Sequence, residues 1–264
     1  MKKIIYIFSF LFVMLLTSCE VEESQSNYPK TIQARNAFNY VENSIHQSVI
    51  LLDLMTKVSY YSEAANDKKE GIKNYFISSY SIDSTANCWI LKNDYQEITF
   101  THNNKSINET DAIWTAKISI NLWNGTTQTS VEDKNCKVQC IGDKSWKINT
   151  LDFAFYGYYQ NGFTASADLN VAGIDAYEKL ESIYDFKVKT GSGITKIDNA
   201  KLTYNVLQPT TYTNSNKSQG LIIKDGEIEV SIDNESDKIN AEIISSDYYY
   251  PTVKITYKGI TETY

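Results

Sequence analysis

The sequence has few residues from which a histidine- or arginine-based site could be built. It has 264 residues and two histidines, His46 and His102, and Arg35 is its single arginine. Serine and cysteine hydrolases need a base held beside the nucleophile, and neither histidine has a supporting motif around it. The Gly-x-Ser-x-Gly, His-Glu-x-x-His and phosphate-binding glycine motifs are also missing. We therefore expect no catalytic residues and no cofactor.

Acidic residues outnumber basic ones, 32 to 25. The formal net charge is −7 at pH 7, and a chain with one arginine lacks the basic surface that binds phosphate backbones. We therefore expect no nucleic-acid partner. Paired carboxylates for glycoside hydrolysis leave no signature in sequence, so that class stays open.

Four cysteines are present, Cys19, Cys88, Cys136 and Cys140. In a strand, Cys136 and Cys140 would be about 13 Å apart, whereas a disulfide needs Cα atoms within about 7 Å. These two therefore cannot pair, while a Cys88 disulfide to either one stays open. The Cys-x₃-Cys spacing lacks a second Cys/His pair, so we expect buried thiols and no metal site.

The N-terminal segment has the pattern of a secretion signal. Lys2 and Lys3 precede an apolar run from residue 4 to 16, which ends in Leu16-Thr17-Ser18-Cys19. This resembles the lipobox of bacterial lipoproteins. The resemblance implies cleavage after residue 18, lipidation of Cys19 and attachment to a membrane without spanning it.

Residues 19–30 form a polar stretch that we predict to be a flexible tether. Its Glu20-Val21-Glu22-Glu23 segment resembles the surface-export signal of Bacteroidota lipoproteins. That resemblance covers residues 1–23 and implies an outer-membrane location, with the cell surface as one possible face.

The body, residues 31–264, is predicted to be mostly β with one helix. Residues 31–59 repeat apolar side chains at spacings of three and four, which places them on one helix face. From residue 72 the period is two, and clean alternation around Ile228, Val230 and Ile232 indicates antiparallel strands with one dry face. We predict a long helix packed on a large antiparallel sheet, an open barrel or a sandwich.

The predicted strands are separated by turn residues. They span residues 75–81, 88–92, 95–101, 113–122, 128–141, 145–159, 163–171, 180–189, 197–207, 221–232, 239–245 and 252–264. Residues 66–71 are predicted to end the helical region. Gly191-Ser192-Gly193 and Lys224-Asp225-Gly226 are predicted turns, and residues 208–220 form a polar break that could divide the body.

Two tyrosine groups are the candidate ligand-binding residues, because a tyrosine ring suits sugar stacking or protein contact. They are Tyr156, Tyr158 and Tyr159, and Tyr248, Tyr249 and Tyr250. Asp233-Asn234-Glu235-Ser236-Asp237 carries oxygen donors but reads better as a solvated turn than as a calcium loop. Asp83-Ser84-Thr85 resembles the O-glycosylation acceptor of exported Bacteroidota proteins, which implies a sugar on Ser84.

These features predict a lipid-anchored, non-enzymatic envelope protein that binds a glycan or protein partner. A periplasm-facing carrier that holds an apolar ligand between helix and sheet is one alternative, and a carboxylate-based glycosidase is another.

Overall fold

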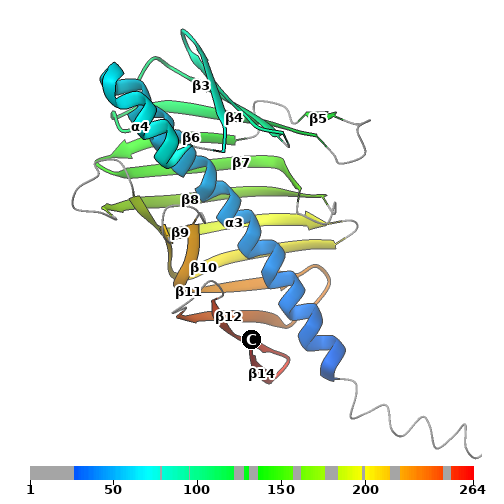
Figure 1. Cartoon of the computed structure of the whole chain (residues 1–264). Coiled ribbons are helices and arrows are strands. Elements are labelled where there is room, and N and C mark those ends of the chain that lie inside the picture. The colour runs from blue at the N-terminus through cyan, green and yellow to red at the C-terminus, as the bar shows by residue number, and fades with distance from the viewer. Residues whose placement is uncertain are drawn as a thin grey trace, which may run out of the picture.

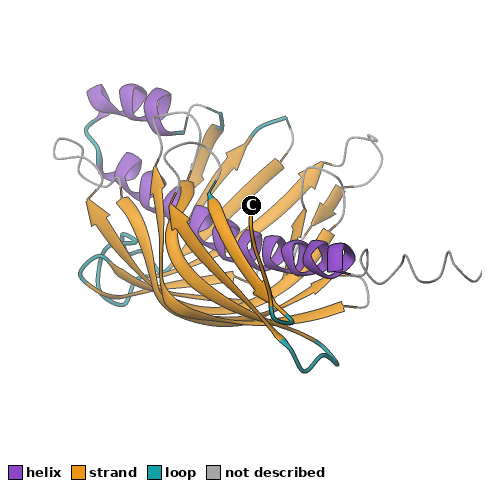
Figure 2. Cartoon of the chain, turned by 90° about the horizontal axis from the view of Figure 1, so that it is seen from below, coloured by secondary structure: helices purple, strands orange, loops and turns teal. Residues whose placement is uncertain are grey.

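The computed structural model of the chain describes residues 27–77, 79–94, 96–121, 128–130, 136–156, 162–175, 184–197, 200–214, 221–245 and 251–264. A long helix lies diagonally across one strongly curved sheet, on its concave side (Figures 1 and 2). Residues 1–26, with the predicted signal and Cys19, lie outside the described part. Neither helix in the described part has the length and apolarity needed to cross a membrane.

Helix α3 (Asn27–Glu63) is the predicted long helix, extended at both ends. It begins before Thr31, so residues 27–30, which we assigned to the tether, are helical. Pro29 is compatible with this because proline is tolerated in a first helical turn. The predicted apolar stripe is confirmed, since its central residues are fully buried: Val41, Ile45, Val49, Leu52 and Met55.

Three hydroxyl side chains interrupt this apolar face, and each of them forms a hydrogen bond. Ser44, Ser48 and Thr56 are all fully buried. Each hydroxyl donates to a helix carbonyl one turn back: to Val41 O at 2.7 Å, Ser44 O at 2.8 Å and Asp53 O at 2.8 Å, respectively. Such local bonds remove most of the desolvation cost of burying a hydroxyl.

A second helix, α4 (Asn66–Phe76), occupies a segment that we predicted incorrectly. Residues 66–71 were expected to end the helical region, and residues 75–81 to form a strand. Lys68, Lys69, Glu70 and Lys73 are good helix formers, and burying Ile72 fixes one face of this short helix against the body. The first strand begins only at Ser81.

Fourteen antiparallel strands form one sheet. The strands are β1 (Ser81–Thr85), β2 (Cys88–Lys92), β3 (Gln96–His102), β4 (Ile113–Asn121), β5 (Gln128–Ser130), β6 (Cys136–Gly142), β7 (Ser145–Tyr156), β8 (Gly162–Asp175), β9 (Tyr184–Ile197), β10 (Ala200–Asn214), β11 (Leu221–Ile232), β12 (Lys238–Ser245), β13 (Thr252–Tyr257) and β14 (Ile260–Thr263). They pair in chain order, except that β5 pairs with β4 beside the main path. In the described part, β1 and β14 form the two edges of the sheet and do not pair with each other. The fold class is thus confirmed as one open curved sheet with a long helix, neither a closed barrel nor a sandwich.

Two predicted strands are each divided in the structure. The strand at 128–141 is present as β5 and β6, which both pair with β4. The strand at 252–264 is a hairpin, because Lys258 and Gly259 adopt φ angles of 50° and 77° between β13 and β14. Two residues with positive φ form the tight turn that matches the twist of an antiparallel pair.

Gly191-Ser192-Gly193 is not a turn but the middle of β9. Gly193 lies opposite Tyr204 of β10. A Cβ atom at Gly193 would lie 2.4 Å from the Ser166 carbonyl oxygen and 2.6 Å from the Tyr204 hydroxyl. Glycine here lets a buried tyrosine ring lie close to the backbone of a bending strand.

Lys224-Asp225-Gly226 is likewise inside a strand, β11, rather than a hairpin turn. Gly226 has a φ of 129° and lies against Thr210 of β10, next to Pro209. The pairing of β10 shifts register here on both sides. Proline cannot donate to a ladder, so it occurs where the ladder is interrupted. The polar break predicted from residue 208 is therefore, up to Asn214, a bulged part of β10.

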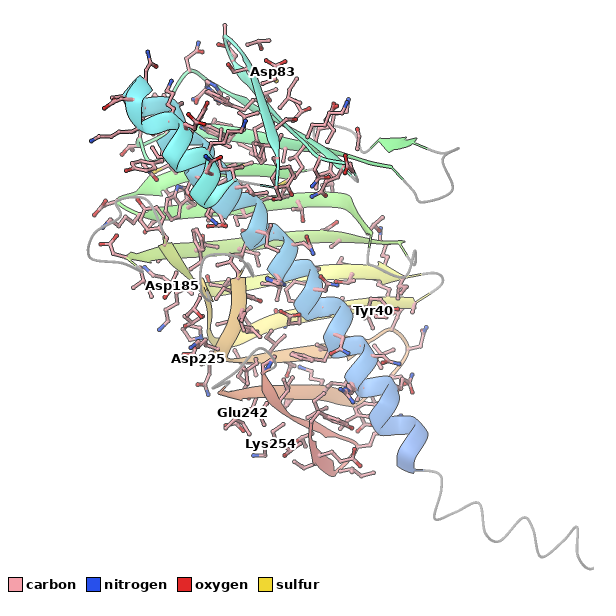
Figure 3. All side chains as sticks on the ribbon, in the orientation of Figure 1. Tyr40, Asp83, Asp185, Asp225, Glu242 and Lys254 are labelled. Atoms are coloured by element: carbon pink, nitrogen blue, oxygen red, sulfur yellow. The ribbon has the colours of Figure 1, made fainter. Side chains whose placement is uncertain are left out.

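The convex face of the sheet is polar. Charged residues alternate with the buried ones and pair across neighbouring strands, as do Lys254 and Glu242 at 3.2 Å (Figure 3) and Lys238 and Glu229 at 2.8 Å. Exposed pairs of this kind contribute at most about 1 kcal/mol each. The stability of the fold therefore rests on the concave face and on α3.

Candidate functional site

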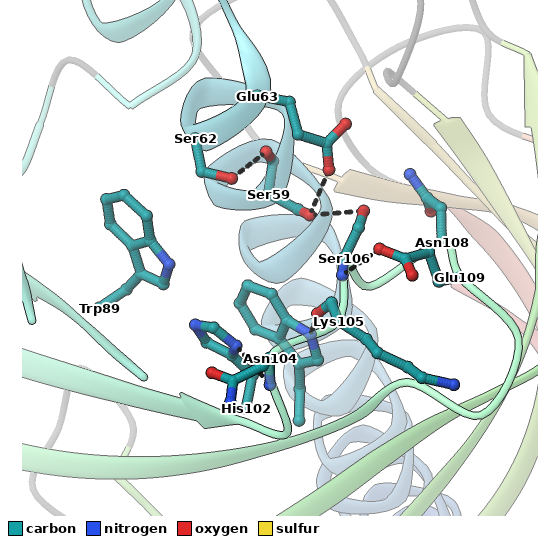
Figure 4. Close-up of a pocket in the computed structure, with 11 residues that line it drawn as sticks. Ser59, Ser62, Glu63, Trp89, His102, Asn104, Lys105, Ser106, Asn108 and Glu109 are labelled. Carbon is teal, nitrogen blue, oxygen red and sulfur yellow. Dashed lines mark hydrogen bonds between the residues drawn. The ribbon is translucent and has the colours of Figure 1, made fainter. Parts of the chain in front are cut away.

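A pocket of about 480 Å³ opens where α3 ends. Its walls come from the last turns of α3, from β2, and from the connection between β3 and β4, residues 103–112 (Figure 4). We call this connection the pocket loop. Polar and aromatic side chains converge on this hollow.

Local backbone chemistry shapes the pocket loop. Asn104 and Asp111 have φ angles of 62° and 63°, a conformation that asparagine and aspartate tolerate better than most residues. Asn103 closes the base of the loop, because its side chain donates to Asp111 O at 3.1 Å and accepts from Ile113 N at 3.0 Å. The sequence of the loop is therefore suited to a tight and defined shape.

Two buried tryptophans hold the loop from beneath. The indole N–H of Trp114 donates to Lys105 O at 3.0 Å, and that of Trp146 donates to Ile107 O at 2.9 Å. Both indoles and the Ile107 side chain are almost fully buried. These contacts fix the loop before any ligand binds, which lowers the entropy cost of binding.

Ser59 joins α3 to the pocket loop. Its hydroxyl accepts from Ile107 N at 3.2 Å, lies 2.9 Å from the Ser106 hydroxyl and bonds to the Glu63 carboxylate at 3.2 Å. The Glu109 carboxylate accepts from Ser106 N at 2.9 Å. The two carboxylates thus belong to one hydrogen-bond network on one wall of the pocket (Figure 4).

His102 lies at the end of β3 and lines the floor of the pocket. Its ring stacks on Trp114 at a centroid distance of 4.9 Å, and its Nδ1 accepts from Asn104 N at 3.2 Å. Burial lowers its pKa, so the ring is neutral at pH 7 and carries its proton on Nε2. Among the described residues no hydrogen bond joins His102 to a serine hydroxyl, so the pocket does not hold an assembled Ser–His pair.

Trp89 forms the opposite wall. It is half-buried, and the Tyr61 ring meets it edge-on at 6.1 Å with an interplanar angle of 87°. In Figure 4 its indole faces the pocket across from Ser106 and Glu109. The pocket therefore combines an aromatic surface on one side with hydrogen-bonding groups on the other.

The structure does not test the tyrosine groups that we predicted from the sequence. Tyr156 is the last residue of β7, and its side chain is outside the described part. Tyr158, Tyr159, Tyr248, Tyr249 and Tyr250 lie outside the described residues altogether, as does Cys19. Ser84 is exposed on the edge strand β1, where its glycosylation stays a prediction.

The remaining cysteines are thiols. Cys136 and Cys140 are buried on one face of β6, and Cys88 is half-buried and unpaired. Burial raises the pKa of Cys136 to about 12, which makes it a poor nucleophile. In the described part of the chain, no three histidine, cysteine, aspartate or glutamate side chains gather as a metal site would require.

The acidic turn at 233–237 packs against its neighbours. Glu235 pairs with Lys258 at 2.7 Å and accepts a short hydrogen bond from the Tyr257 hydroxyl. The Glu235 carboxylate is therefore committed to the β13–β14 hairpin rather than free to ligate a cation. This agrees with the interpretation of the segment as a turn.

A second polar cluster lies along one flank of α3. His46 stacks on Tyr212 at 5.5 Å and bonds to Leu221 O at 2.8 Å, as a satisfied boundary histidine should. Burial raises the pKa of Glu42 to about 7. Burial also raises the pKa of Tyr212, and the negative charge of Glu42 raises it further. The Tyr212 hydroxyl is buried and has no hydrogen-bond partner among the described residues. This cluster makes the helix–sheet contact sensitive to the charge on Glu42.

Sequence reasoning missed the pocket, although three tryptophans in or beneath it share a position in their strands. Trp89, Trp114 and Trp146 are each the second residue of a strand, in β2, β4 and β7. These three strands run in the same direction, so their first residues lie toward one end of the sheet. The repeated position of tryptophan at strand starts was the signal that could have located the pocket.

No protein-family model matches the chain, and comparison with curated proteins and with solved structures finds no match either. The chemistry of the pocket therefore carries the functional assignment.

Proposed function

We propose that the protein is a lipid-anchored, non-enzymatic protein of the cell envelope that binds a glycan in the pocket at the end of α3. The observation that carries this is the half-buried Trp89, which faces a wall of serine, glutamate and asparagine side chains. Sugars present apolar C–H faces and a rim of hydroxyls, and a pocket with an aromatic wall and convergent polar groups matches both.

The position of the pocket suits this role. Helix α3 has 37 residues and is therefore about 55 Å long. The proposed lipidated residue, Cys19, precedes the first residue of α3 by eight positions, whereas the pocket is at the other end. An anchor at Cys19 would place the pocket tens of ångströms from the outer membrane, where a glycan could reach it.

The carrier alternative is less well supported. It requires room for an apolar ligand between α3 and the sheet, but the α3 side chains that face the sheet are buried against it. In Figure 2 the helix itself occupies the hollow of the sheet. Helix and sheet thus pack directly on each other in the described part.

One observation favours the glycosidase alternative. Glu63 and Glu109 both line the pocket, and glycosidases use two carboxylates. Here, however, both carboxylates belong to one hydrogen-bond network on the same wall of the pocket (Figure 4) and do not flank the hollow from two sides. We therefore propose binding rather than hydrolysis.

A glycan array tests the proposal. The body from Tyr28 onward should bind a subset of glycans, and Trp89→Ala should abolish that binding. Tyr264→Ala is the matched control, since Tyr264 is another half-buried ring, placed under Arg35 at 4.6 Å. Equal binding by Trp89→Ala and the parent would contradict the proposal, as would binding to a protein partner alone. Release of shortened glycan would establish the glycosidase instead.

A further inference from the structure

Several of the donors around the pocket are committed to the protein itself. The Ser62 hydroxyl donates to Ser59 O at 2.6 Å, and the backbone N–H groups of Asn104 and Ser106 donate to His102 and Glu109. Lys105 donates through Nζ to Thr110 O at 2.9 Å, within its own loop. Together with the indole N–H of Trp114, these groups are engaged before a ligand arrives.

Acceptors also remain available. Glu63 and Glu109 each use Oε1 in the bonds described above, and a carboxylate has a second oxygen with its own lone pairs. Asn108 also lines the pocket, and its Oδ1 is buried with no hydrogen-bond partner. A buried acceptor without a partner is costly, but this oxygen has almost no accessible surface, so the exposed carboxylate oxygens are the acceptors that a ligand reaches first.

The charges of the lining residues also favour a ligand that donates hydrogen bonds. Two carboxylates line the pocket against one ammonium, that of Lys105. A ligand that carries carboxylate, sulfate or phosphate would meet repulsion. A ligand with protonated amines would form charge-assisted hydrogen bonds to Glu63 and Glu109, which are stronger than bonds between neutral groups.

We infer that the pocket binds a cationic amino sugar, with the sugar ring against Trp89 and a free amine directed toward Glu63 and Glu109. This inference rests on the proposed function and adds the chemical class of the glycan. The inference predicts different affinities for two sugars that share one backbone and differ only in whether the amine is free or acetylated.

Calorimetric titration with two hexasaccharides of the same linkage tests it: one of glucosamine, the other of N-acetylglucosamine. At pH 6 the glucosamine hexamer should bind at least about ten-fold more tightly. Equal or tighter binding of the acetylated hexamer overturns the inference but leaves a glycan-binding pocket intact. Failure of the glucosamine hexamer to bind also overturns it, while the Trp89→Ala array result separately decides whether the pocket binds glycans at all.

The acidic residues provide the second arm. Glu63→Gln and Glu109→Gln should each weaken binding of the glucosamine hexamer about five- to ten-fold and leave the acetylated one within about two-fold, because glutamine keeps the acceptor but removes the charge. Glu242→Gln, on the convex face, is the matched control (Figure 3). Equal losses for both hexamers would show a structural role for the carboxylates and contradict the inference.

Discussion

The two ends of α3 differ in what packs against them. Toward its N-terminus the helix contacts β9 to β13, whose inward side chains are mainly aliphatic and buried, among them Ile228, Val230, Ile239, Ala241 and Ile255. At its C-terminus it meets the pocket loop through the hydroxyl of Ser59. The aliphatic region provides hydrophobic stability, whereas the pocket end presents polar groups to a hollow. Under the proposed function, stability and recognition therefore belong to different parts of one continuous sheet.

The largest expected effect comes from placing a charge in the apolar stripe. Leu52→Asp should lower the free energy of unfolding by roughly 4 kcal/mol or more, because an unpaired carboxylate would replace a fully buried side chain. Asn36→Asp adds the same charge on an exposed part of the helix and should change stability little. Chemical denaturation measures both, and equal stabilities would show that α3 is peripheral.

Glu42 should make stability depend on pH. Its pKa is about 7 in the fold, above the ordinary 4.5, so the unfolded chain releases this proton first. Stability should therefore fall as pH rises from about 4.5 through 7, by at most about 3 kcal/mol. Glu42→Gln should stabilise the protein at pH 8 and change nothing at pH 4. A variant that is no more stable than the parent at pH 8 would show that this carboxylate is solvated.

Gly193 tests the close strand contact in β9. Gly193→Ala should cost about 1–3 kcal/mol, since the new methyl would overlap the Ser166 carbonyl and the Tyr204 hydroxyl. Gly142→Ala is the matched control, because a Cβ there meets nothing within 4 Å. Similar melting temperatures for the two variants would mean that the sheet accommodates a side chain at this bend.

The smallest effect on stability is expected at the anchor. Cys19→Ser should leave the unfolding of the body unchanged, since residue 19 precedes the described structure, but should release the protein from membranes. Fractionation after a salt wash measures this. A serine variant that still partitions with membranes would contradict lipidation at Cys19.

The fold class could be predicted because periodicity reports directly on burial. The helix stripe around Ile45 and the alternation in β11 are both confirmed by the buried residues of the structure. The errors concentrate at glycine and proline. Gly193 and Gly226 were interpreted as turns, yet in a long curved sheet the same conformational freedom creates bends and bulges inside strands.

The pocket could not be predicted because its residues are distant in sequence. Ser59 lies 47 positions from Ser106, and only the docking of α3 along the sheet brings them together. His102 ends β3 and stacks on Trp114, and no sequence motif linked it to Trp89 or Glu63. The sequence does contain a tryptophan near the start of each of three strands, β2, β4 and β7. Because these strands run in the same direction, the three tryptophans lie toward one end of the sheet.

Hydrogen–deuterium exchange with and without bound glycan tests the central claim most directly, namely that recognition belongs to the pocket end and stability to the aliphatic strands. The probe is the glycan that gives the strongest array signal. We predict slower exchange in residues 103–112 and in the last turn of α3, with β11 to β13 unchanged. Protection confined to β11–β13, or none in the pocket loop at saturating glycan, would contradict this account.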